Sequence, residues 1–245
     1  MLGLQVLVAL LLVAGMYLLN FTAGNLTMPR PDAVFVQSVR MWSDGTMLKG
    51  LWESLTVLSL GFLLSAVTGI GLGILLGGFR FLGRVFDPFV NAMNSTPGAA
   101  FIPLIIVWFG LYTEAKVVVV WNAAMFPILI ATASGIANAN KDLVEMARAF
   151  GASRTRLFFS IMVPDALPSI LSGLRIGAAV CTVGTVIAEL TMAQSGLGGL
   201  LVTAGNRFQM DRYFAVVIVL MALGTLITAL LRQAENRISR WRAAR

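Results

Sequence analysis

Long apolar stretches alternate with short polar intervals along this chain, and the intervals hold nearly all of its charged side chains. The apolar stretches cover about residues 2–19, 51–78, 99–111, 117–136, 168–192 and 213–231. A helix crosses the roughly 30 Å hydrocarbon core of a bilayer with about 20 apolar residues. The pattern therefore predicts an all-α integral membrane protein with about six transmembrane helices.

Composition supports this prediction and excludes an ordinary soluble domain. Of the 245 residues 58% are hydrophobic and 12% are charged, and the mean hydropathy is +0.86. We expect residues 1–50 to hold the first transmembrane helix, rather than a cleaved signal peptide, and an extracytoplasmic loop with an interfacial helix. Residues 51–231 then form a core of five transmembrane helices, and residues 232–245 a basic cytoplasmic tail.

The distribution of lysine and arginine predicts the orientation of the helices. With both termini in the cytoplasm, the cytoplasmic intervals carry eleven of these residues and the outer intervals six, with Arg175 left uncounted. Cytoplasmic loops of membrane proteins are enriched in positive charge. We therefore expect a multi-pass membrane protein with both termini in the cytoplasm, and its charge at helix ends gives no reason to expect a nucleic-acid partner.

Small residues recur at every fourth position in two of the apolar stretches. The first stripe consists of Gly61, Ser65, Gly69, Gly73 and Gly77, and the second of Ser169, Gly173, Gly177, Cys181 and Thr185. Such stripes allow helix backbones to approach closely in a membrane. We predict that both stripes are packing surfaces and that Cys181 is a packing residue.

The interval 138–165 has the pattern of two short helices separated by a glycine. Leu143, Met146, Ala147 and Phe150 follow the spacing of one helical face. Gly151 can end this helix in a left-handed conformation, and Ser153 can cap a second one. An apolar face outside the membrane is suited to docking in a groove of a partner protein.

This interval resembles the EAA signature of ABC importer permeases. The matching residues are Glu145, Ala147, Gly151, Ile161 and Pro164, with Met146 and Val163 as conservative departures. Shorter segments such as PRPDAVF, FIPLIIVWFGL, LPSILSGLRIG and SGLGGLL are similar to the nitrate, sulfonate and taurine type of these permeases. The resemblance extends over nearly the whole chain.

The resemblance implies a location in a bacterial inner membrane, the transmembrane fold of type I ABC importers and a defined set of partners. These are a second permease copy, a cytoplasmic ABC ATPase dimer that docks on the coupling helix at about 138–165, an extracytoplasmic solute-binding protein, and lipid. The chain itself has no lysine after a glycine that could form a phosphate-binding loop. We therefore expect no enzymatic activity and no bound cofactor, since the partner uses the ATP and Mg²⁺. The substrate stays open among small anions and vitamin-precursor heterocycles.

Five polar residues are candidates for the translocation path. Asn94, Ser95 and Thr96 lie where a helix is expected to break, and irregular backbone at membrane depth needs a protein or water lining. Glu189 is an acidic residue inside a predicted span, and Thr185 lies one turn before it. Each has a structural alternative: helix-start chemistry for the first three, bonding to its own helix for Thr185, and interfacial hydrogen bonding for Glu189.

Two other functional classes compete with the ABC permease. An ion-coupled secondary transporter usually has several ionisable residues within its spans, and few are present here. An intramembrane enzyme would need a nucleophile and a base, and the chain has no histidine. Copurification with an ATPase would separate the permease from both, and the single cysteine and missing histidines argue against a metal site.

Overall fold

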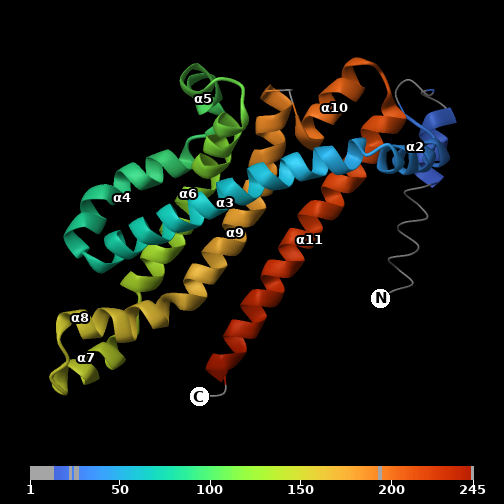
Figure 1. Cartoon of the computed structure of the whole chain (residues 1–245). Coiled ribbons are helices and arrows are strands. Elements are labelled where there is room, and N and C mark those ends of the chain that lie inside the picture. The colour runs from blue at the N-terminus through green and yellow to red at the C-terminus, as the bar shows by residue number, and fades with distance from the viewer. Residues whose placement is uncertain (1–13, 22–23, 25–27, 193–194, 244–245) are drawn as a thin grey trace. The chain divides into compact units, whose positions relative to one another are not determined.

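A computed structural model describes residues 14–21, 24, 28–192 and 195–243, and helices make up most of them (Figure 1). Residues 14–21 are also helical. The labelled helices are α2 (Pro31–Ser43), α3 (Thr46–Gly78), α4 (Arg80–Ser95), α5 (Ile102–Phe109), α6 (Thr113–Ala137), α7 (Lys141–Ala149), α8 (Arg154–Leu157), α9 (Val163–Met192), α10 (Gly196–Asn206) and α11 (Met210–Ala243). A 3₁₀ turn (Gly98–Phe101) precedes α5, and a π-helical turn (Phe158–Met162) joins α8 to α9.

Four helical segments of the described chain are long and apolar enough to cross a membrane. They are Thr46–Gly78, Thr113–Ala137, Arg154–Met192 and Met210–Leu230. A fifth span results if the bent pair Arg80–Ser95 and Gly98–Phe109 counts as one. The expected first span, 2–19, lies mostly outside the described residues, and the other five predicted spans overlap these five segments.

The helix break expected near Asn94, Ser95 and Thr96 is present, and the predicted span 99–111 is only the second part of a bent pair of helices. The α5 helix has only eight residues, which corresponds to about 12 Å of rise. It follows α4, a helix of 16 residues in the interval between two predicted spans, and the two segments meet at 88°. Thr96 precedes Pro97 and has extended backbone, because proline disfavours a helical conformation at the preceding residue.

Two further boundaries differ from the prediction. Residues 195–212 lie in the polar interval between the last two predicted spans, but they contain the helix α10. The fifth span was expected to begin at Pro168, whereas the helix is already continuous from Arg154, and Pro164 follows the π-helical turn Phe158–Met162. The sixth span continues through residues 232–243 as α11, so the backbone of the predicted tail is helical.

The chain divides into two compact units by its contacts. One contains residues 1–56 and 186–223, and the other contains residues 57–185 and 224–245. In the first, α2 is a helix where an interfacial helix was expected, and the Asp44 carboxylate begins α3 by accepting a hydrogen bond from the Thr46 amide at 2.9 Å. Hydrogen bonds from the Thr46 side chain and backbone lower the pKa of Asp44.

Both small-residue stripes pack against α6 in the second unit, as predicted. A Cβ atom added at Gly61 would lie 2.5 Å from Val120, and one added at Gly73 would lie 2.5 Å from Thr132. In α9, a Cβ atom added at Gly177 would lie 2.6 Å from Ile128 of α6. The missing side chains therefore let α3 and α9 approach α6 closely.

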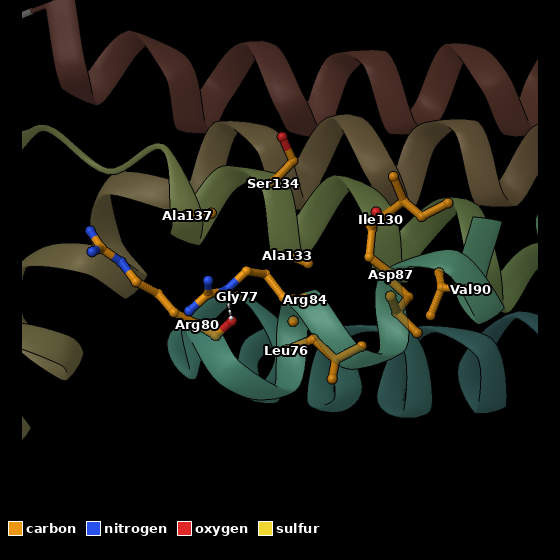
Figure 2. A pocket seen from close by; sticks show the side chains of 12 residues that line it. Leu76, Gly77, Arg80, Arg84, Asp87, Val90, Ile130, Ala133, Ser134 and Ala137 are labelled. Carbon is orange, nitrogen blue, oxygen red and sulfur yellow. Dashed lines mark hydrogen bonds between the residues drawn. The ribbon is translucent and has the colours of Figure 1, made fainter.

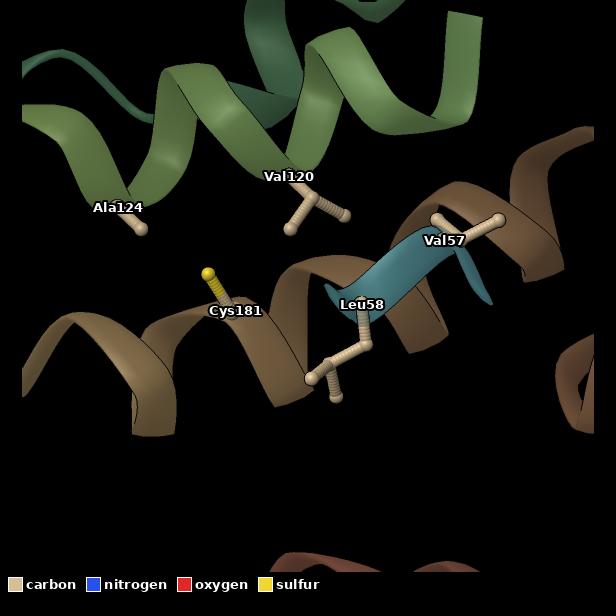
Figure 3. Packing of buried hydrophobic residues seen from close by; sticks show 5 residues of the cluster. All are labelled: Val57, Leu58, Val120, Ala124 and Cys181. Carbon is tan, nitrogen blue, oxygen red and sulfur yellow. The ribbon is translucent and has the colours of Figure 1, made fainter. Parts of the chain in front are cut away.

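A buried apolar cluster lies where these three helices meet (Figure 3). Val57 and Leu58 come from α3, Val120 and Ala124 from α6, and Cys181 from α9. The Cys181 side chain has no solvent exposure. Its predicted role as a packing residue is confirmed.

Candidate functional site

The segment from Asn138 to Asp165, called here the coupling segment, lies beyond the ends of α6 and α9 (Figure 1). The Asn140 side chain caps α7 by accepting hydrogen bonds from the amides of Asp142 (2.9 Å) and Leu143 (3.3 Å). The Asn140 amide donates to the Asp165 carboxylate at 2.9 Å. These contacts tie the beginning of the segment to the beginning of α9.

Gly151 ends α7 in the left-handed conformation that the sequence predicted, with φ at +78°. The Ala152 amide donates to the Ala147 carbonyl at 3.0 Å, and the Gly151 amide donates to the Arg148 carbonyl at 3.0 Å. This pair of bonds is a Schellman motif. A Cβ atom at Gly151 would meet nothing within 4 Å, so backbone conformation and not lack of space requires glycine here.

The second half of the segment leads directly into the membrane-spanning helix. The Ser153 side chain accepts a hydrogen bond from the Arg156 amide at 3.3 Å and so caps α8 as predicted. The π-helical turn follows, and such turns are frequent at functional sites. Phe158 in this turn packs with the buried residues Ile136, Ala166 and Ile170.

Some of the signature residues are exposed and others are half-buried. Glu145, Met146, Gly151 and Pro164 are exposed, whereas Ala147 and Ile161 are half-buried. The sequence placed Phe150 on the apolar face expected outside the membrane, and its side chain is 86% exposed. With Leu143 and Met146, Phe150 forms an exposed apolar surface, which we call the apolar tip.

The path candidates near the chain bend are exposed. Asn94 and Ser95 are the last residues of α4, and Thr96 follows them at the 88° bend. The Thr96 hydroxyl donates to the Ala92 carbonyl at 2.9 Å. Their exposure is compatible with a lining role and with a contact to another chain, and their role stays a prediction.

The other two candidates are buried. Thr185 donates its hydroxyl to the Cys181 carbonyl at 2.9 Å, which is the bonding to its own helix that the structural alternative described. The Glu189 carboxylate accepts hydrogen bonds from the Ser54 hydroxyl at 2.8 Å and from the Gly198 amide at 2.8 Å. Glu189 thus takes part in a polar cluster at the beginning of α10.

Three side chains hold the first amides of α10. In addition to the bond from Gly198 to Glu189, the Gly196 amide donates to Glu53 at 2.7 Å and the Leu197 amide donates to Ser54 at 2.9 Å. Carboxylates are favourable at the positive end of a helix. Sequence reasoning missed Glu53 and Ser54, because 143 residues separate them from their partners in α10.

Comparison with known proteins indicates the family of this chain. The family described as "Binding-protein-dependent transport system inner membrane component" matches residues 69–240. A probable ABC transporter permease of Brucella melitensis is 31% identical over 98% of this chain and 97% of its own. The putative aliphatic sulfonates transport permease SsuC of Escherichia coli is 33% identical over 89% and 82%. The formylaminopyrimidine transport permease ThiX of Halalkalibacterium halodurans is 30% identical over 88% and 86%.

A solved structure confirms the fold class. The inward-facing MetNI methionine ABC transporter matches with a TM-score of 0.67 and 23% identity, over 79% of this chain and 94% of that chain. The described helices therefore form the transmembrane fold of type I ABC importers, as the EAA resemblance implied.

Proposed function

The chain belongs to the family of inner membrane components of binding-protein-dependent transport systems and is an ABC transporter permease. From this premise we propose that it imports a small sulfonate-type anion or a heterocyclic vitamin precursor. An extracytoplasmic binding protein delivers the solute, and two permease copies form the path. A cytoplasmic ABC ATPase dimer supplies the energy from ATP and Mg²⁺.

The apolar tip is the observation that carries the proposed docking of the ATPase. Phe150, with 86% of its side chain exposed, lies directly before the fixed turn at Gly151. A large apolar side chain on a rigid support is the kind of residue that dominates protein interfaces. An amphipathic helix with such a face docks into a groove.

The packing of the coupling segment against the membrane-spanning helices supports transmission of movement to the membrane. Phe158 packs against Ile136 of α6 and Ala166 of α9, and the helix is continuous from Arg154 to Met192. A displacement of the docked tip would therefore move α9 along its length. Rocking of such helices alternates access to a path between the two sides of the membrane.

Positive charge near the coupling segment supports a cytoplasmic location of this segment. A Cβ atom at Gly78 would lie 2.6 Å from Phe158, so the end of α3 adjoins the segment. Arg80 and Arg84 follow at that end, and α8 carries Arg154 and Arg156. By the positive-inside rule this end faces the cytoplasm, and both termini are proposed to lie there.

Replacement of Phe150 by serine tests the docking site. We expect Phe150→Ser to weaken binding of the cognate ATPase by roughly 30-fold, the effect of losing a hot-spot side chain worth about 2 kcal/mol. Phe35→Ser is the matched control, because Phe35 is 70% exposed but belongs to α2. Binding is measured with purified permease in lipid nanodiscs, and ATP-driven uptake with proteoliposomes. Unchanged binding in Phe150→Ser would refute docking at this tip.

The substrate class requires a separate experiment with the cognate binding protein. We expect its thermal stability to rise with either alkanesulfonates or aminopyrimidines, and uptake by the reconstituted transporter to follow the same preference. A response only to amino acids or sugars would overturn the proposed substrate class and leave the assignment to the family intact.

A further inference from the structure

A pocket of about 480 Å³ lies between the end of α3, the helix α4 and the helix α6 (Figure 2). We call it the α4 pocket. Leu76, Val90, Leu129 and Ile130 contribute apolar walls, and Arg80 and Arg84 contribute positive charge. The volume lies within the roughly 300–1,000 Å³ range of small-molecule sites. We propose that the α4 pocket binds the headgroup and upper acyl chain of an anionic phospholipid.

The position of α4 against α3 is fixed by a close backbone contact. A Cβ atom added at Gly83 would lie 2.7 Å from the Leu76 carbonyl oxygen. On the opposite wall, a Cβ atom at Gly77 would lie 2.6 Å from the Ala133 carbonyl oxygen of α6. The three helices that enclose the pocket therefore have little freedom to close it.

The two arginines are available to a ligand. Arg84 donates from Nε to the Arg80 carbonyl at 3.4 Å, which leaves its two terminal nitrogens free of that contact. Asp87 also lines the pocket, but in Figure 2 it lies at the end near Val90 and Ile130, away from Arg80. Among the residues that the structure describes, no ion pair joins Asp87 to either arginine. Guanidinium groups bind phosphate oxygens with paired hydrogen bonds.

The surroundings favour a lipid over a water-soluble anion. The pocket lies where the membrane-spanning helix α3 ends, which is the depth of lipid headgroups. No residue of α4 is buried, and Phe81 and Phe89 on this helix are 73% and 66% exposed. Such a surface needs acyl chains or another apolar partner around it. Basic pockets between helices on the cytoplasmic side are suited to anionic headgroups.

Titration of the purified full-length chain with single lipids tests the site. Native mass spectrometry would compare phosphatidylglycerol with phosphatidylcholine, and we expect tighter binding of phosphatidylglycerol. Each basic residue near a membrane surface contributes roughly a factor of five to affinity, so Arg80→Gln with Arg84→Gln should weaken phosphatidylglycerol binding roughly 30-fold. The matched control is Arg154→Gln with Arg156→Gln, which removes two exposed arginines of α8 at the same end.

A second variant separates the pocket from its charge. Val90→Trp should fill the pocket beside its apolar wall and reduce phosphatidylglycerol binding while both arginines remain. The α4 helix has no buried residue and should tolerate this substitution. Equal binding of the two lipids, or equal effects of the two arginine pairs, would overturn the proposal. Displacement of the lipid by inorganic phosphate alone would instead indicate a site for a soluble anion. Loss of lipid binding when the transporter assembles would indicate that another subunit covers the α4 pocket. Displacement by phosphate and loss on assembly would each refute a lipid site.

Discussion

Replacement of Gly73 by alanine should separate α3 from α6 and destabilise the protein. The added Cβ atom would lie 2.5 Å from Thr132 Cβ and 2.8 Å from the Leu129 carbonyl oxygen. Carbon atoms pack at about 3.5–4.0 Å, so the two helices would have to part by about 1 Å. The Leu129 oxygen belongs to the backbone and cannot rotate away.

The expected cost follows from this overlap. Overpacking of a close contact typically costs about 1–3 kcal/mol. A gap of about 1 Å also forfeits up to about half of the dispersion energy of the neighbouring contacts. Alanine gains up to about 1 kcal/mol over glycine in helix propensity, which offsets part of the loss. The overlap remains the larger effect.

Gly71 provides a control in the same helix. A Cβ atom at Gly71 would meet nothing within 4 Å, so Gly71→Ala has the same gain in propensity without the overlap. The free energy of unfolding of both variants would be measured in mixed micelles by titration with a denaturing detergent. We expect Gly73→Ala to be less stable than Gly71→Ala by about 1–3 kcal/mol. A difference below about 0.5 kcal/mol would show that the stripe is not a tight packing surface.

Two other sites give predictions of the same kind. Glu189→Ala should leave the Gly198 amide without its acceptor and lower the stability of α10 by about 1–3 kcal/mol. Faster amide hydrogen exchange in α10 would reveal this loss. Glu189→Gln retains an acceptor oxygen and should cost less. Gly151→Val should strain the turn of the coupling segment and reduce ATP-driven uptake, whereas Gly45→Val imposes the same strain at φ +77° and should leave uptake near the wild-type rate. Equal losses of uptake in the two glycine variants would contradict a special role of the coupling segment.

Local patterns in the sequence determined those features whose cause lies within a few residues. The stripes that contain Gly73 and Gly177 were readable because residues four apart share a helix face. The left-handed turn at Gly151 and the cap at Ser153 were readable for a similar reason, since both act on amides within three residues. The EAA signature combined these local features at fixed spacing, and so it indicated the family.

Other features depended on neighbours distant in the chain. The sequence indicated a helix break near Thr96, but neither the angle of 88° nor the helix α4 before it was predicted. The helix α10 depends on Glu53 and Ser54, far away in the chain, for its first hydrogen bonds.

The sequence by itself determined that the chain is helical, membrane-embedded and built around close glycine contacts, and it located the coupling segment. Only the tertiary structure decided which distant groups meet: the Glu189 carboxylate accepts from the Gly198 amide of α10, and Arg80 lies beside an apolar pocket. The physical reason is the distance along the chain over which each interaction acts. Helix periodicity and capping act over one or two turns, whereas hydrogen bonds and cavities between helices require the whole chain to be folded.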